Sequence, residues 1–312
     1  TADDVLARQG AVIEKWLRVF LSPGDVVELR ALRVAGKRAV CEVHGDLAVM
    51  AHRAVELDGM GAQGTYFTLN PLRPDLVQGK ASCRAADVIE RHWLPLDLDP
   101  YRPKDTSSTE DELRAAWTVL DRARGLLDSA GMSGAVVGHS GNGWHLCYPV
   151  LLPNDNDAQE LIKRVLKGLH QRCGDPLAAE EEAELKAGNP LPVGKAKVEV
   201  DVHDAPRIWK LYGTAARKGV STPQRPHRRT RLVEGEPWSR ETAGLNSMAL
   251  HSLLASWQFV KDARRGRPQT SNASYAAAAL RQEAQAVAGA GVGDRNNQLN
   301  RSAFALGQLV GS

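Results

Sequence analysis

Apolar residues recur along this chain with two different periods, and together they predict a mixed set of helices and strands. The helical spacing of three to four residues covers 3–21, 47–57, 109–130 and a segment from Asn154 or Asp155 to about Arg172. Short apolar runs predict strands at 26–34, 39–43, 65–69, 93–99, 136–137, 144–152, 198–200 and 207–211. Because strands and helices alternate, we expect an α/β or α+β fold rather than a helical bundle.

The composition changes near Lys261, which indicates a domain boundary. Residues 264–275 are rich in Arg, Gly, Pro, Ser and Asn, as linkers are. Helical spacing returns at 275–287 and 297–310. We therefore expect one main domain over 1–260, followed by a linker and a helical appendage over 261–312.

The overall composition is that of an ordinary soluble globular protein. Charged residues make up 25% of the chain, hydrophobic residues 43%, and the formal net charge is +3. The chain has no apolar run of about 18 residues and no secretory signal pattern at its start. We therefore expect a cytoplasmic protein with no membrane contact. The chain starts at Thr1 and stops inside an apolar pattern, so we interpret it as part of a longer protein.

The small net charge conceals an uneven distribution. Residues 207–231 hold eight Lys or Arg and no acidic residue, so the rest of the chain carries about −5. Such a run usually forms a solvated face, but it also suits the binding of polyanions, and the run alone favours neither. The four cysteines form no C-x-x-C motif, so we expect free thiols.

Asp97 and Asp99 are the first candidates for chemistry. Residues i and i+2 of a strand point to the same face, so both carboxylates project together from the end of the strand predicted at 93–99. Pro100 and Pro103 then end that strand. Two neighbouring carboxylates suit a hard divalent ion such as Mg²⁺ or Mn²⁺. The alternative is a solvated strand end without a ligand.

A second candidate is the turn Ser140-Gly141-Asn142-Gly143, followed by Trp144 and His145. A glycine-rich turn between strands exposes backbone N–H groups that can hold phosphate oxygens, and His145 could add a donor. The alternative is a simple hairpin with a packed histidine. The chain has neither the dinucleotide-binding nor the P-loop glycine pattern at this point.

A third acid, Asp201, ends another apolar strand. Six residues later the basic run begins with Arg207-Ile208-Trp209-Lys210-Leu211-Tyr212-Gly213-Thr214. If Asp201 meets the first two acids in space, a three-carboxylate metal site results.

These three features, in this order, resemble the motifs of the archaeo-eukaryotic primase superfamily, specifically the bifunctional primase-polymerases of phages, plasmids and mobile elements. The resemblance spans about residues 90–230. It implies two facing α/β units, of which the C-terminal one is similar to an RNA-recognition-motif sheet, with 1–260 as the catalytic domain. It also implies template-directed nucleotidyl transfer, in which primers are made and extended on single-stranded DNA.

The resemblance further implies a role for each motif. Asp97, Asp99 and Asp201 would hold two divalent ions, Mg²⁺ or Mn²⁺, for catalysis. The residues expected to contact the incoming NTP or dNTP are Ser140, Gly141, Asn142, Gly143, His145, Arg207, Lys210 and Lys218. Those expected to follow the DNA template are Arg225, Arg228, Arg229 and Arg231. Residues 294–300 resemble the helical region that precedes a helicase or other replication module in such proteins.

Two other functions remain open from the sequence. A replication-initiator or single-strand-binding module on the same scaffold would bind DNA without synthesis. A metal-dependent nuclease would use the same acids and basic residues but would not need nucleoside triphosphates.

Overall fold

The computed structural model describes residues 2–77 and 82–265 and, beyond them, only the isolated residues 282, 285, 286, 288, 289, 298 and 302. The chain divides into two compact units, 1–258 and 259–312. The helices predicted at 275–287 and 297–310, and most of the predicted linker, fall on residues outside this description. Within the described residues, no helix is both long enough and apolar enough to cross a membrane.

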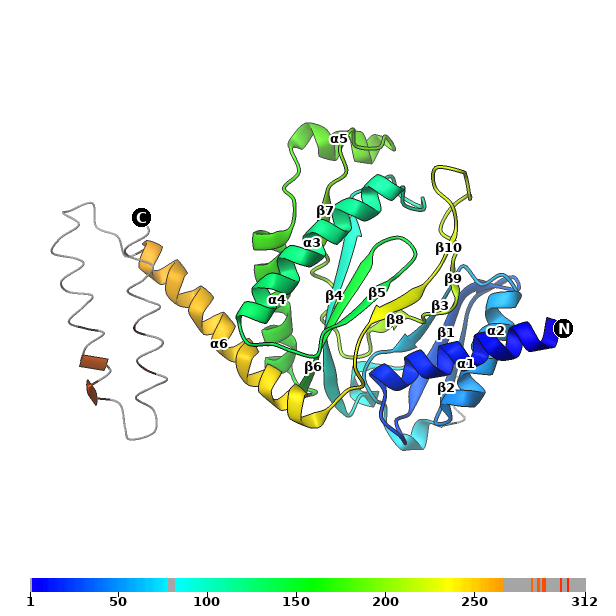
Figure 1. Ribbon diagram of the computed structural model, residues 1–312, viewed down its shortest axis with the longest axis horizontal. Helices are drawn as coiled ribbons and strands as arrows, with labels where there is room; N and C mark the ends of the chain where they lie inside the picture. Colours follow the sequence, from blue (N-terminus) through cyan, green and yellow to red (C-terminus); the bar gives the residue numbers. More distant parts are fainter. Residues whose placement is uncertain are drawn as a thin grey trace. The chain divides into compact units, whose positions relative to one another are not determined.

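Two antiparallel sheets organise the first unit (Figure 1). Its first part contains α1 (Ala2–Phe20), β1 (Val27–Val34), β2 (Lys37–His44), α2 (Leu47–Gly59), β3 (Gly64–Thr68) and the single turns η1 (Pro74–Leu76) and η2 (Ala85–Asp87). The four-stranded sheet has the order β2-β1-β3-β8, and its last strand, β8 (Ile208–Lys210), comes from far along the chain. The N-terminal sheet is therefore completed by the basic motif that begins at Arg207.

The second sheet carries the predicted acid and turn motifs. Its elements are β4 (Glu90–Pro100), α3 (Glu110–Ser129), β5 (Val136–His139), β6 (Trp144–Pro153), α4 (Asn156–Cys173), α5 (Ala179–Ala187), β7 (Ala196–Val198) and β11 (Arg231–Glu234). The strand order is β11-β5-β6-β4-β7. A separate short pair joins β9 (Ala215–Ala216) to β10 (Arg228–Arg229), and α6 (Arg240–Arg265) follows.

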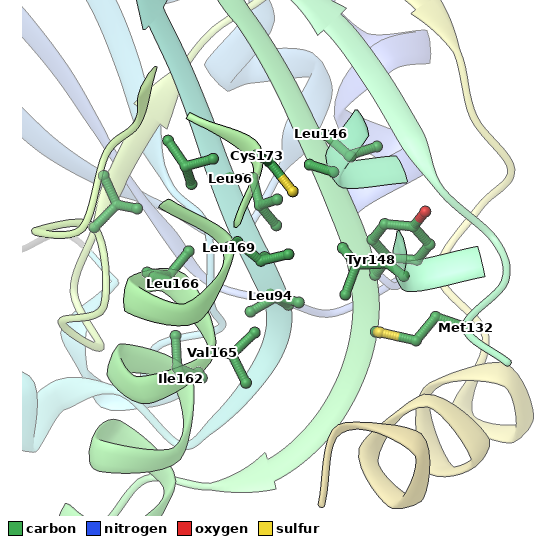
Figure 2. Close-up of a cluster of buried hydrophobic side chains, with 14 of the residues drawn as sticks. Leu94, Leu96, Met132, Leu146, Tyr148, Ile162, Val165, Leu166, Leu169 and Cys173 are labelled. Carbon is green, nitrogen blue, oxygen red and sulfur yellow. The ribbon is translucent and has the colours of Figure 1, made fainter. Parts of the chain in front are cut away.

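Alternation along β4 places one face of the five-stranded sheet in each of two cores. Leu94, Leu96 and Leu98 pack with the apolar stripes of α3 and α4, as Figure 2 shows for part of this cluster. Trp93, on the opposite face, packs with Phe20 and with residues of the four-stranded sheet. The five-stranded sheet is therefore covered by α3 and α4 on one face, and by α1 and the four-stranded sheet on the other.

Most of the elements expected from periodicity are present, and the predicted mixed α/β class is confirmed. The capping box of Thr109 and Glu112 starts α3, and Asp155, one of the two caps considered, starts α4. The strand predicted at 198–200 lies instead at 196–198, which leaves Glu199 just beyond its end.

Helix α6 was missed because its buried face carries polar residues. Asn246 and Ser247 are buried, and they bond the carbonyls of Pro149 and Leu151 on β6 at 2.8 and 3.1 Å. These polar groups satisfy backbone acceptors, but they interrupt the apolar stripe by which a helix is recognised. The helix α5 was missed because it buries none of its residues.

The packing of α6 on α4 depends on Gly168. A Cβ at this position would lie 2.0 Å from the Trp257 ring, which also stacks on the guanidinium of Arg172 at 4.2 Å. We expect Gly168→Ala to displace Trp257 and to lower the free energy of unfolding by about 1–3 kcal/mol. Gly125→Ala, at an exposed position of α3 with no atom near the added methyl, should raise the free energy of unfolding by up to about 1 kcal/mol. Urea unfolding of both variants checks this, and equal effects would contradict the packing.

Candidate active site

Asp97 and Asp99 lie on the face of β4 that is turned toward the four-stranded sheet. They share this face with Trp93, and their side chains are 27% and 29% exposed. The same-face arrangement expected from their spacing is therefore present, at the edge of a core rather than on an open surface.

The environment of Asp97 strongly disfavours a negative charge. Burial raises the pKa of this carboxyl well above its usual range, and the charges of Asp99 and Glu199 raise it further. Arg102 and Arg207 oppose this effect without cancelling it. A divalent cation would relieve both the desolvation and the repulsion, so this donor set fits a hard metal ion.

Arg102 holds Asp99 and the nearby turn together, a role that was not predicted. Its guanidinium lies 3.3 Å from the Asp99 carboxylate and bonds the carbonyl of Asn142 at 3.4 Å and that of Thr106 at 3.2 Å. Its side chain is only 7% exposed. A cationic residue three positions after Asp99 was the available signal in the sequence.

The turn 140–143 is built directly against the acid motif. A Cβ on Gly143 would lie 2.5 Å from the carbonyl oxygen of Leu98 and 2.7 Å from the carboxylate of Asp99, so only glycine permits this approach. The side-chain oxygen of Asn142 accepts a bond from the Ser108 amide at 3.1 Å, so this side chain anchors the turn to the segment before α3. Ser140 closes the turn by a backbone bond to Gly143 at 3.0 Å.

His145 is buried beside Asp97, with its Nε2 3.7 Å from the carboxylate. Its Nδ1 lies 2.8 Å from the Tyr212 hydroxyl, and its ring packs on Trp209 with centroids 3.9 Å apart. Burial, with the charge of Lys210, lowers the pKa of His145 to about 3, so the ring is neutral near pH 7. His145 is therefore a packed, neutral histidine that lies beside Asp97.

Gly138 makes room for this arrangement. It pairs with His145 across β5 and β6, and a Cβ there would lie 2.2 Å from the Tyr212 hydroxyl oxygen. A larger residue would push the hydroxyl away from the imidazole. Neither Gly138 nor Tyr212 was predicted as part of the site, because their contact depends on pairing across 74 residues of chain that sequence patterns do not show.

The structure does not gather Asp201 with the first two acids. Its side chain is exposed, and its carbonyl accepts a bond from Arg207, which also pairs with Asp204. The acid whose charge reaches Asp97 is Glu199, whose amide bonds the Asp97 carbonyl at 2.8 Å. Among the described residues, no three His, Cys, Asp or Glu side chains are close enough to form a ready-made metal cluster. Glu199 therefore lies beside the pair of Asp97 and Asp99, and the expected triad with Asp201 stays a prediction.

Lys210 and Tyr66 pair across β8 and β3 near the acids. Lys210 is 6% exposed, and its Nζ lies 4.4 Å from the centre of the Tyr66 ring. Burial raises the pKa of Tyr66 to about 12, with help from the charges of Asp97 and Asp99. Lys218, by contrast, is half-buried, and its carbonyl accepts a bond from the Ser107 hydroxyl at 2.9 Å.

Much of the basic run is neutralised by acids from other parts of the chain. Arg225 lies 2.7 Å from buried Glu112, and Arg228 lies 2.7 Å from Glu110. The side chains of Arg217 and Arg229 both reach buried Asp58, at 2.7 and 3.4 Å. Arg231 is exposed and makes no ion pair within the described residues. The run thus ties loops to α2 and α3, and only part of it is free to meet a polyanion.

The structure is similar to several solved structures at low sequence identity. A primase-polymerase domain from cyanophage S-2L is 12% identical, with 78% of this chain and 96% of that chain covered and a TM-score of 0.38. The catalytic domain of primase RepB′ in complex with initiator DNA is 13% identical, with 84% and 100% covered and a TM-score of 0.38. The polymerase domain of Mycobacterium tuberculosis ligase D in complex with DNA is 13% identical, with 80% and 88% covered and a TM-score of 0.41.

No model of a protein family matches the sequence, and no curated protein matches it. The three solved structures are described as a primase-polymerase, a primase and a polymerase.

The buried Lys210 predicts a specific pH dependence of stability. Burial lowers its pKa from 10.5 to about 7, so between these values the unfolded chain binds more protons than the folded one. The penalty for burying Lys210 is therefore complete below about pH 7 and is lost as the pH rises toward 10.5. We expect Lys210→Met to be more stable than the parent at pH 7, with an advantage that shrinks by up to about 1.4 kcal/mol per pH unit on the way to pH 10.

Urea unfolding at pH 7, 8, 9 and 10 measures this difference. Lys37→Met, at an exposed position on β2, is the control for general effects of removing a lysine. An advantage of Lys210→Met that stays constant over this range would contradict the lowered pKa.

Proposed function

We propose that this protein is a DNA primase and polymerase that makes and extends primers on single-stranded DNA from NTPs or dNTPs. The observation that carries the proposal is the pair Asp97 and Asp99, held on one strand face against the glycine turn 140–143. Repulsion between these partly buried carboxylates destabilises the fold, so the pair suggests a role that requires a bound cation.

Asp97, Asp99 and Glu199 are the residues that would hold Mg²⁺ or Mn²⁺. When bound, two such ions lower the pKa of an attacking 3′-hydroxyl and neutralise charge on the departing pyrophosphate. Arg102 restrains Asp99, because its ion pair keeps the carboxylate from rotating freely.

His145 would act as a neutral hydrogen-bond donor to the triphosphate. Burial raises the pKa of Tyr212 well above its usual range, so its hydroxyl keeps its proton and can donate to Nδ1 of His145. The other ring nitrogen, Nε2, then carries the imidazole proton on the side of Asp97. Ser140 and the backbone of Gly141, Asn142 and Gly143 would supply further donors at the same edge.

The cationic residues then divide into two groups. We assign nucleotide phosphate contacts to Arg207, Lys210 and Lys218, as the motif order suggests. The side chain of Arg229 is 56% exposed, which is more than for the other ion-paired arginines of the run 207–231, so Arg229 keeps the template role. The ion pairs of Arg225 and Arg228 give these two residues a structural function as well, because they tie their loop to the start of α3.

Replacing both acids tests the proposal. We expect Asp97→Asn with Asp99→Asn to reduce primer synthesis on unprimed single-stranded circular DNA by at least about 100-fold. Removing the buried repulsion should also raise the unfolding temperature in EDTA, and it should abolish the stabilisation that Mn²⁺ gives the parent protein. Labelled nucleotides on a gel measure the first effect, and thermal unfolding measures the other two.

The same gel separates the alternative functions. A nuclease would shorten labelled DNA without added nucleotides, and a binding module would retain DNA without incorporating any nucleotide. Either result, or synthesis by the double variant, would overturn the proposal. Asp157→Asn, an exposed acid on α4, is the matched control and should change none of the measurements.

The third acid is tested by a second pair of variants. We expect Glu199→Gln to reduce synthesis by at least about tenfold and to weaken the stabilisation by Mn²⁺, because its charge lies near Asp97. Asp201→Asn should change synthesis less than threefold, since its side chain is exposed. The reverse order of effects would restore Asp201 as the third ligand.

A further inference from the structure

A pocket lies on the face of the five-stranded sheet that is opposite to Asp97. It has a volume of about 430 Å³, which is within the usual range for small-molecule sites. Its walls come from α3, from the ends of β5 and β6 that flank the turn 140–143, and from β10 and β11. The residues that line it are Glu110, Leu113, Arg114, Trp117, Thr118, His139, Trp144, Arg228 and Arg231.

One wall of this pocket is aromatic. Trp117 and Trp144 meet edge to face, with ring centres 4.6 Å apart, and His139 meets Trp144 at 4.8 Å. Both indoles are only partly buried. The Trp144 N–H is already bonded to the Leu113 carbonyl at 3.0 Å, so this ring is fixed in place. A rigid, partly exposed aromatic wall is suited to stacking a planar base.

The pocket also has a cationic part. Arg228 is paired with Glu110, whereas Arg231 is exposed and makes no ion pair within the part of the chain that the structure describes. With Arg114, the lining has three guanidinium groups against one carboxylate. Arg231 pairs directly with His139 across β11 and β5, so the free cation sits next to the aromatic wall.

His139 provides a polar group that lacks a partner. It is 5% exposed, and its Nδ1 is buried without a hydrogen bond among the described residues. Burial, with the charges of Arg231 and Arg228, lowers its pKa to about 4, so the ring is neutral near pH 7. A neutral imidazole nitrogen can donate to or accept from the edge of a base, and a buried one without a partner favours a ligand that supplies it.

We propose that this pocket binds a nucleotide, with its base against Trp117 and Trp144, a polar edge of the base or sugar on His139, and its phosphate on Arg231. The ligand is either a free nucleoside monophosphate or the 5′-phosphorylated end of a DNA strand, since both present the same chemistry. This site is separate from the acids of the proposed catalytic site, and its existence does not require nucleotidyl transfer.

Titration calorimetry of the full chain in EDTA tests the proposal without divalent metal. The probes are deoxyadenosine 5′-monophosphate, deoxyadenosine, inorganic phosphate, and a deoxyadenylate tetramer with and without a 5′-phosphate. We expect one phosphorylated probe to bind per chain, more tightly than the matching probe without the phosphate and more tightly than phosphate alone. Tighter binding of the monophosphate identifies a free nucleotide, and tighter binding of the phosphorylated tetramer identifies a strand end.

Variants then locate the bound nucleotide. Arg231→Ala should weaken the phosphorylated probe by about tenfold and leave deoxyadenosine unchanged, whereas Trp117→Phe should retain more binding than Trp117→Ala. Arg38→Ala, an exposed arginine on an edge strand of the other sheet, is the control and should change nothing. Far-ultraviolet circular dichroism confirms that each variant is folded.

The variant with both Asp97→Asn and Asp99→Asn should bind the probe as the parent does. Loss of binding in that variant, with full binding in Arg231→Ala, would place the nucleotide at the acids and overturn the proposal. So would the absence of binding by all probes, or equal binding of phosphate alone. Failure of primer synthesis has no bearing on these results, so the two proposals can fail independently.

Discussion

The site depends on one electrostatic constraint, the repulsion between two carboxylates on the same face of a largely buried strand. Asp97 cannot be ionised at low cost in this position, because burial and the charge of Asp99 oppose it. The surrounding structure holds them there nevertheless. The leucines on the opposite face anchor β4 in the helical core, Arg102 restrains Asp99, and Gly143 allows the turn to close against Asp99. Keeping this arrangement lowers the stability of the fold, as strained functional sites do in other proteins.

The basic segment shows how a charge run can serve the fold before it serves a ligand. Asp58, Glu110 and Glu112 come from α2 and α3, and they accept most of the arginines that the sequence groups together. Because Glu112 also caps α3, its pair with Arg225 ties the helix start, the loop and the segment beside the turn into one unit. Net charge along the sequence was therefore a poor guide to free charge on the surface, since neutralising partners lie more than 100 residues away.

Local patterns predicted the elements and the acid pair, and they failed where distant contacts decide. The spacing of Asp97 and Asp99 was enough to place both on one face, and the capping box was enough to start α3. The same local reasoning placed Asp201 directly after a strand, whereas β7 ends at Val198, and the contacts of the strand with β4 decide where it ends. Gly138 and Tyr212 were beyond its reach, since neither is unusual until the sheets bring them together.

The hairpin of β5 and β6 is a single layer of backbone between the surroundings of Asp97 and the pocket lined by Trp117 and Trp144. Gly138 and His145 belong to one side, and His139 and Trp144 belong to the other, because successive residues of a strand alternate in direction. Sliding β6 past β4 by one residue would place Trp144 or Leu146, in place of His145, opposite Asp97. The number of residues between His139 and Trp144 is therefore under tighter constraint than their identity. An insertion or deletion in this turn would change the surroundings of Asp97 and the pocket together, whereas a substitution in the turn would alter only one of them.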